Sequence, residues 1–203
     1  MLTTSQAARL LDALAPLPRT MAGLVMLTGL RRGEVFALRW RDLDEESRVL
    51  TIREAIYDGV FDTPKTEASA RQIPLSDAAS LLLAQWRART TTIHPESLVF
   101  STRLGTPLVP NNVIRRHLAP ACKTLGLRRA TWLTFRRSYS SWSHDEGVPP
   151  KVVAQLMGHA NVDTTLNVYT QVLEGSLRAA VDKIGTELFT IVQSPPGGSA
   201  LTH

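Results

Sequence analysis

The sequence predicts an α+β domain that is mostly helical and contains a small antiparallel sheet of three strands. Apolar residues recur with helical spacing in residues 4–40 and again in residues 77–192. Between these regions, residues 49–75 alternate polar and apolar side chains around turn residues, as short strands do. The chain has 203 residues, of which 43% are hydrophobic and 20% charged, so one globular domain with a sizeable core is expected.

The helical regions divide at glycine and proline. Thr4 or Ser5 is expected to cap a first helix, which proline residues 16 and 18 end. A second, buried helix over 21–27 stops at Gly29, and a short third helix follows Arg31 and closes in a turn at 42–44. Further helices are expected at 77–89, 111–125, 134–146, 150–157, 162–171 and 175–192.

The strands are expected at 49–53, at 60–61 after an Asp58-Gly59 turn, and at 71–75 on an edge of the sheet. Lys65 lies between the second and third strands, where a long side chain can reach a ligand. The proline- and glycine-rich residues 194–203 are expected to be a disordered tail, which leaves 1–193 as the domain.

The charge balance favours a phosphate-bearing partner. The formal net charge is +5, and only four of the 23 basic residues are lysines, a bias toward the planar guanidinium group that pairs with phosphate oxygens. Cys122 is the only cysteine, which excludes an intrachain disulfide and suits a reducing, cytoplasmic environment. No apolar stretch has the length of a membrane span, so no membrane partner is expected.

Four residue types suited to phosphodiester chemistry occur in order along the chain: Arg31, Arg136, His159 and Tyr169. An arginine fork binds two phosphate oxygens, and a phenolic oxygen can act as a nucleophile. Each residue alone is ordinary, because surface arginines, structural histidines and half-buried tyrosines are common. Glu34, three residues after Arg31, can orient its guanidinium on a helix. In the Arg136-Arg137 doublet, Phe135 and Tyr139 form an apolar seam that one arginine must approach.

Together these residues resemble the tyrosine recombinases of the phage integrase family. The likeness is carried by residues 28–40 (TGLRRGEVFALRW) and 156–169 (LMGHANVDTTLNVY), with Lys65 in a Pro-Lys-Thr setting between them. The resemblance extends from Leu2 to about Ile184 and implies the tyrosine recombinase catalytic fold.

The resemblance implies that Arg31 and Arg136 bind the scissile phosphate of double-stranded DNA and that Tyr169 attacks its phosphorus. Lys65 would be the general acid, and His159 would donate a hydrogen bond to the phosphate. Glu34 would hold the shape of the site. A 3′-phosphotyrosine intermediate conserves the bond energy, so no cofactor and no metal is expected.

Two departures from the family pattern stand out. Leu133 occupies the position where the family usually has a histidine, and a leucine can neither donate a hydrogen bond nor carry a proton. The helical amino-terminal domain that grips DNA in relatives is expected to be absent, as in a truncated form or a minimal enzyme. The remaining DNA contacts are expected from five basic residues, which could instead form a solvated helix face: Arg115, Arg116, Lys123, Arg128 and Arg129.

Three other functions remain open. The chain could be a catalytically weak or inactive DNA-binding module, a helix-turn-helix regulator, or a strand-relaxing enzyme like the type IB topoisomerases. A metal-dependent nuclease is disfavoured because the histidines show no ligand spacing. A homo-tetramer on DNA is expected, and the helix over 175–192 could dock on a neighbouring protomer or pack on its own domain.

Overall fold

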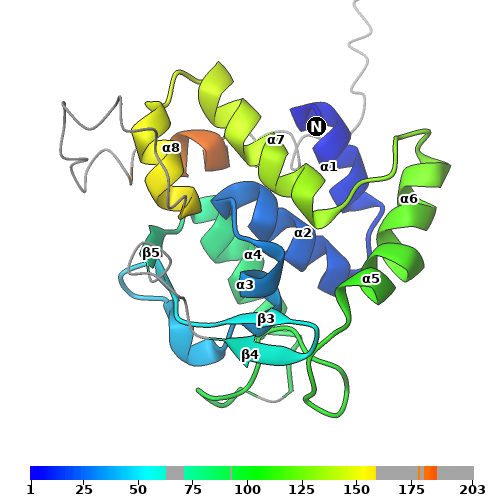
Figure 1. Cartoon of the computed structure of the whole chain (residues 1–203), viewed down its shortest axis with the longest axis vertical. Helices are drawn as coiled ribbons and strands as arrows, with labels where there is room; N and C mark the ends of the chain where they lie inside the picture. Colours follow the sequence, from blue (N-terminus) through cyan, green and yellow to red (C-terminus); the bar gives the residue numbers. More distant parts are fainter. Residues whose placement is uncertain (63–70, 92, 159–177, 179–180, 187–203) are drawn as a thin grey trace, which may run out of the picture.

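The computed structural model describes residues 1–62, 71–91, 93–158, 178 and 181–186. It confirms a mostly helical α+β fold with a small antiparallel sheet, in which α2 lies at the centre and packs against α1, α4 and α7 (Figure 1). The helices are α1 (Thr4–Asp12), α2 (Pro16–Thr28), α3 (Arg32–Ala37), α4 (Asp77–Arg87), α5 (Pro110–Val113), α6 (Ala119–Thr124), α7 (Trp132–Asp145) and α8 (Pro150–Met157). Of the expected helices, 162–171 and most of 175–192 lie outside the described residues, and so does the expected tail over 194–203.

The first two helices begin earlier than the sequence suggested. The start of α1 is one residue earlier, and the start of α2 is five residues earlier. Thr3, rather than Thr4 or Ser5, caps α1: its hydroxyl accepts from the Gln6 backbone N–H at 3.1 Å, and the Gln6 side chain accepts from the Thr3 N–H at 3.0 Å. Pro16 does not end α1 but opens α2, because the first turn of a helix needs no N–H donor at that position.

The sheet has a different third strand from the one expected. The strands β1 (Leu43–Asp44), β2 (Val49–Ile52) and β5 (Arg71–Pro74) pair antiparallel in the order β1-β2-β5, with β5 on an edge as expected. Residues 60–62 form β4 (Val60–Asp62), which pairs instead with β3 (Ala55–Tyr57) in a separate hairpin. Both turn residues have positive φ, 49° at Asp58 and 84° at Gly59. These values are typical of the tight two-residue hairpin turn that the Asp-Gly sequence favours.

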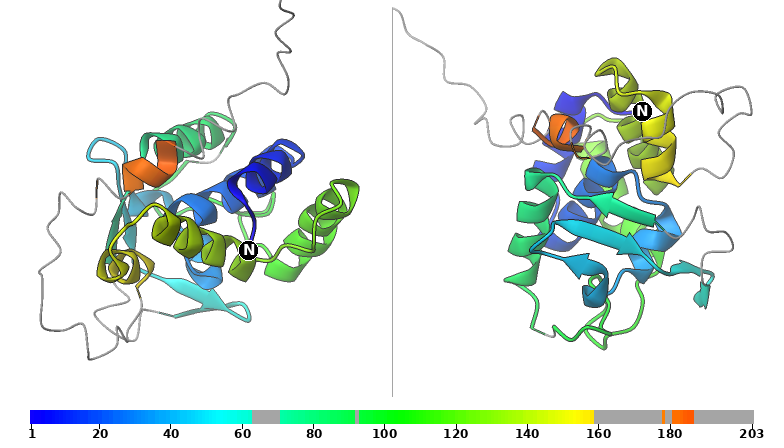
Figure 2. Two further views of the ribbon diagram at one scale, coloured as in Figure 1. Left: turned by 90° about the horizontal axis from the view of Figure 1, so that it is seen from above. Right: turned by 90° about the vertical axis from the view of Figure 1, so that its left-hand side faces the viewer.

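The helix expected over 111–125 is interrupted by a π-helical turn, Ile114–Leu118, between α5 and α6. Pro120 has no N–H to donate to the carbonyl of Arg116, and the N–H of Ala119 bonds to the carbonyl of Ile114 instead. This helical pair and β5 lie on opposite sides of α2 (Figures 1 and 2).

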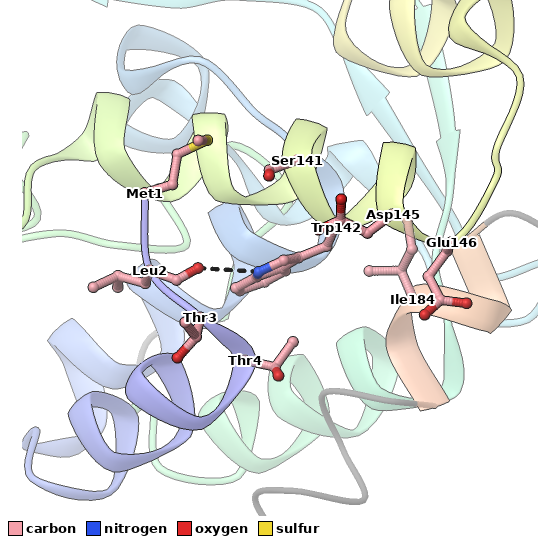
Figure 3. Close-up of a pocket in the computed structure, with 9 residues that line it drawn as sticks. All are labelled: Met1, Leu2, Thr3, Thr4, Ser141, Trp142, Asp145, Glu146 and Ile184. Atoms are coloured by element: carbon pink, nitrogen blue, oxygen red, sulfur yellow. Dashed lines mark hydrogen bonds between the residues drawn. The ribbon is translucent and has the colours of Figure 1, made fainter.

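The first residues of the chain are held against α7. The Leu2 N–H donates to the Ser138 hydroxyl at 2.9 Å. The Trp142 indole N–H donates to the Leu2 carbonyl at 3.1 Å (Figure 3). A cavity of about 430 Å³ lies beside this segment and is lined by Met1, Leu2, Thr3, Thr4, Ser141, Trp142, Asp145, Glu146 and Ile184. None of these residues is among the four that suit phosphodiester chemistry, Arg31, Arg136, His159 and Tyr169.

The described part of the last helix packs on its own domain. Val181 and Ile184 are buried, and the Arg178 guanidinium donates to the carbonyl of Leu75 at 2.6 Å, just after β5. These contacts favour the intramolecular alternative for residues 181–184. Among the described residues, no helix combines the length and apolar character that crossing a bilayer requires.

Candidate active site

Arg31 lies at a sharp break between two helices. Gly29 ends α2 in the left-handed conformation, with φ of 67°, and Arg31 is the residue that caps α3. A side chain at Gly29 would place its Cβ 2.6 Å from Cδ1 of Tyr139, so glycine is required both by the backbone and by the close approach of α7. The break therefore holds the start of α3 directly against α7.

Glu34 fixes Arg31 through two contacts. One carboxylate oxygen accepts from the Arg31 guanidinium at 2.9 Å, and the other accepts from the Arg31 backbone N–H at 2.7 Å. Glu34 is 4% exposed, whereas the Arg31 side chain is 29% exposed. The carboxylate is thus buried behind an arginine that still reaches solvent.

Arg136 is the member of the arginine doublet that turns inward. It is buried in α7 and donates to the carbonyls of Gly29 and Met157, the latter at 2.8 Å, while Arg137 is exposed. Phe36 of α3 packs edge-on against Trp132 at the start of α7, with ring centroids 5.0 Å apart. That contact packs α3 against the beginning of α7, and both arginines line the same cavity.

The carboxyl end of α8 completes the cluster. Gly158 ends this helix with φ of 68°, and its carbonyl accepts a hydrogen bond from Arg31, next to the Met157 carbonyl that accepts from Arg136. The last carbonyls of a helix are unsatisfied and carry the negative end of its dipole, so cations are favoured there. A Cβ at Gly158 would lie 3.0 Å from a terminal guanidinium nitrogen of Arg31, so a side chain would crowd the arginine.

The pKa values of two groups reflect this environment. Burial by itself raises the pKa of the Glu34 carboxyl, but hydrogen bonds from Arg71 and Arg31 and the charge of Arg71 outweigh it and lower the pKa below its ordinary value. Burial, followed by the nearby charge of Arg31, lowers the pKa of Arg136 to about 10. Arg136 therefore keeps its charge at neutral pH, although among the described residues it bonds only to backbone carbonyls. A bound anion would relieve this burial of positive charge.

Arg31 and Arg136 share one cavity of about 510 Å³. Its lining is Arg31, Arg32, Asn111, Ile114, Thr131, Trp132, Leu133 and Arg136. Leu133, which replaces the usual family histidine, is 54% exposed at this cavity. The cavity is therefore open, positively charged and bordered by an apolar side chain where the family pattern has a hydrogen-bonding one.

The family model described as "Phage integrase family" matches residues 1–175. The chain belongs to the phage integrase family. The "Tyrosine recombinase XerC-like" protein of Caldanaerobacter subterraneus subsp. tengcongensis is 26% identical over 181 residues, 77% of this chain and 46% of that protein. The ICEBs1 integrase of Bacillus subtilis is 26% identical over 178 residues, 82% of this chain and 48% of that protein. The chain thus spans about half the length of these relatives.

Solved structures of phage integrase relatives share the fold. The Tn1549 transposon integrase in complex with circular intermediate DNA aligns with a TM-score of 0.70 and 22% identity, covering 90% of this chain and 66% of that one. The XerA recombinase aligns with a TM-score of 0.63 and 21% identity, covering 90% of this chain and 64% of that one. The tyrosine recombinase catalytic fold expected from the sequence is confirmed.

The structure brings together some of the expected site residues of this phage integrase domain. Arg31, Glu34 and Arg136 meet in one cluster. Lys65, His159 and Tyr169 lie outside the described residues, so their roles stay predictions. The described part of the chain contains no group of three or more histidine, cysteine or acidic residues that could hold a metal ion.

The five basic residues expected to contact DNA are all exposed, on the π-helical turn, on α6 and in the loop before α7. Within the part of the chain that the structure describes, none of them pairs with a carboxylate. These segments flank the arginine cavity, since Asn111 and Ile114 precede them and Thr131 follows them in its lining.

Arg71 is a cluster residue that the sequence reasoning did not place in the site. It binds both oxygens of Glu34 at 2.9 Å, and its side chain is 7% exposed. The available signal was its position, six residues after Lys65 at the start of the expected edge strand. An arginine at the start of an edge strand is usually solvated, so its burial depends on a long-range partner that the sequence pattern does not identify.

Proposed function

We propose that residues 1–193 form the catalytic domain of a site-specific DNA recombinase or integrase that breaks and rejoins double-stranded DNA through a 3′-phosphotyrosine intermediate. The observation that carries this proposal is the convergence of Arg31 and Arg136, distant in sequence, on one open cavity with a buried positive charge. Family membership supports the same chemistry, and the resemblance supports assembly as a tetramer on DNA.

In the proposed reaction, Arg31 and Arg136 bind the nonbridging oxygens of the scissile phosphate and stabilise the charge that develops on them. The phenolic oxygen of Tyr169 gives up its proton to solvent water and attacks phosphorus. The bond to the 5′ oxygen breaks, and Lys65 supplies the proton that this oxygen takes. His159 donates a hydrogen bond to the phosphate. Attack by the 5′ hydroxyl of a second strand then reverses these steps and releases Tyr169.

A covalent trap tests this proposal. On a nicked DNA substrate whose short cleaved fragment diffuses away, the protein is expected to form a stable protein–DNA adduct, and Tyr169→Phe is expected to abolish it without weakening DNA binding. Tyr57→Phe, which alters a half-exposed phenol on β3, is the matched control and should still form the adduct. DNA binding without an adduct in the unaltered protein would instead support the inactive DNA-binding module.

A second assay separates a recombinase from a strand-relaxing enzyme. A recombinase is expected to require two recombination sites for complete strand exchange, whereas a relaxing enzyme acts on a single supercoiled plasmid. Relaxation with no exchange between two sites would favour the type IB topoisomerase-like function.

The proposed DNA surface consists of Arg115, Arg116, Lys123, Arg128 and Arg129. Replacing all five by alanine is expected to weaken DNA binding and to reduce the slope of log affinity against log salt concentration by up to about 0.9 for each lost phosphate contact. Fluorescence anisotropy over a salt series measures this slope. Arg89→Ala, at an exposed arginine just after α4, is the control; an unchanged slope in the fivefold variant would rule the surface out.

A further inference from the structure

Arg71 and Arg31 bind the same carboxylate, that of Glu34. Its two terminal nitrogens each donate to a different oxygen of the Glu34 carboxylate, both at 2.9 Å. Each of those oxygens also accepts one hydrogen bond from Arg31, from the side chain or from the backbone N–H. All four contacts are at hydrogen-bond distance, so the carboxylate plane that orients Arg31 is itself set by the fork of Arg71.

Arg71 also changes the net charge of the cluster that contains Arg31. In a simple pair, Glu34 would neutralise Arg31 and weaken its attraction for an anion. Here the same carboxylate faces two guanidinium groups, and the nearly buried Arg71 is the stronger influence on the pKa of Glu34. Because two guanidinium groups share one carboxylate, the cluster of Arg31, Glu34 and Arg71 has a net positive charge.

Arg71 further connects the cluster to α8. Its Nε donates to the Leu156 carbonyl at 2.8 Å. Three successive carbonyls at the end of α8, those of Leu156, Met157 and Gly158, thus accept from three different arginines, Arg71, Arg136 and Arg31 respectively. A Cβ at Gly158 would lie 2.6 Å from a terminal nitrogen of Arg71, so α8 approaches this guanidinium closely.

Arg71 does not line the cavity that Arg31 and Arg136 share. It contacts Glu34 and the end of α8, which also bind Arg31, and the end of α8 binds Arg136 as well. We propose that Arg71 is a positioning residue of the phosphate site, which holds Arg31 in its binding orientation through Glu34 while making no contact with the phosphate. This inference rests on the proposed function for its consequence in catalysis.

The first test is Arg71→Lys, which keeps the charge but cannot bind both oxygens of Glu34 and the Leu156 carbonyl together. Adduct formation on nicked DNA at saturating DNA concentration is expected to slow by about 10²-fold, as misplacement of a positioning group does. The affinity for DNA is expected to change less than twofold. Arg178→Lys is the matched control, because Arg178 also binds backbone carbonyls beside the sheet but lies outside the cluster; its rate should be unaltered.

A double-mutant cycle distinguishes positioning from a general structural role. If Arg71 acts through Arg31, then Arg71→Lys has little further effect in a protein that already carries Arg31→Lys. If the rate reductions of the two single variants multiplied in the double variant, the proposal would be overturned. Circular dichroism and thermal melting of each variant check that the fold persists.

A readout independent of activity keeps this inference separate from the proposed function. Inorganic phosphate is expected to shift the Arg31 Nε–H signal in nuclear magnetic resonance spectra of the unaltered protein and to leave that signal unshifted in Arg71→Lys. Failure of the unaltered protein to form an adduct would count against the recombinase function alone. An equal phosphate response of Arg31 in both proteins would overturn the role of Arg71.

Discussion

Arg136→Lys is expected to lower the rate of adduct formation by about 10²- to 10³-fold, the loss typical of removing one preorganised donor from a transition state. Arg136 donates to the carbonyls of Gly29 and Met157 while it faces the shared cavity, and a lysine ammonium cannot replace a planar fork in that position. Burial and Arg31 lower the pKa of Arg136 to about 10, and the same causes would lower a lysine pKa from about 10.4 toward neutrality. Single-turnover cleavage of nicked DNA measures the rate.

The neighbouring residue provides the control for this prediction. Arg137 is exposed on the same helix, so the Arg137→Lys variant should cleave nicked DNA at the rate of the unaltered protein. If both variants lost activity equally, the loss would reflect a general requirement for arginine on α7, and the assignment of Arg136 to the phosphate would be wrong.

Glu34→Gln is expected to destabilise the domain by about 3–5 kcal/mol, the cost typical of breaking a buried ion pair by removing one partner. Glutamine removes the negative charge that Arg31 and Arg71 share, and its NH₂ group donates where the carboxylate accepted. Urea denaturation followed by circular dichroism measures the free energy of unfolding. Glu96→Gln, at an exposed carboxylate that pairs with Arg41, should leave the denaturation midpoint unchanged.

The contribution of Glu34 depends on pH in a defined direction. The pKa of Glu34 is lower in the folded protein than its ordinary value of 4.5, so the carboxylate stabilises the fold fully above that value. The stability difference between the unaltered protein and Glu34→Gln should narrow as the pH falls below 4.5, and the ionic contribution is lost as the pH passes through the lower, folded pKa. A difference that is the same at pH 7 and at pH 3 would show that the charge of Glu34 is not its cause.

The sequence predicted those elements that local signals determine. The Gly29 break placed the end of α2 and the start of α3, and Pro150 with helical periodicity placed α8. Asp58-Gly59 located the hairpin turn. The family resemblance selected Arg31, Glu34 and Arg136, and the structure places these three together.

The sequence could not predict features that depend on contacts between distant segments. The pairing of β1 with β2 and of β3 with β4 depends on which short strands meet, and short apolar runs carry little information about partners. The role of Arg71 follows from Glu34 on α3 and Leu156 on α8, neither of which is near it in the chain. The π-helical turn follows from Pro120, but a proline inside a helical pattern also fits a simple helix end.

The most direct test of the central claim, that Arg31 and Arg136 bind the negative charge of one scissile phosphate, replaces that phosphate by a neutral methylphosphonate. Cleavage by the unaltered protein and by Arg136→Lys is compared on both substrates. On the phosphate substrate, the Arg136→Lys variant is predicted to cleave about 10²- to 10³-fold more slowly than the unaltered protein. On the methylphosphonate substrate, the two proteins are predicted to cleave at nearly equal rates, because the charge that the arginine stabilises is gone. An equal loss on both substrates would contradict the central claim.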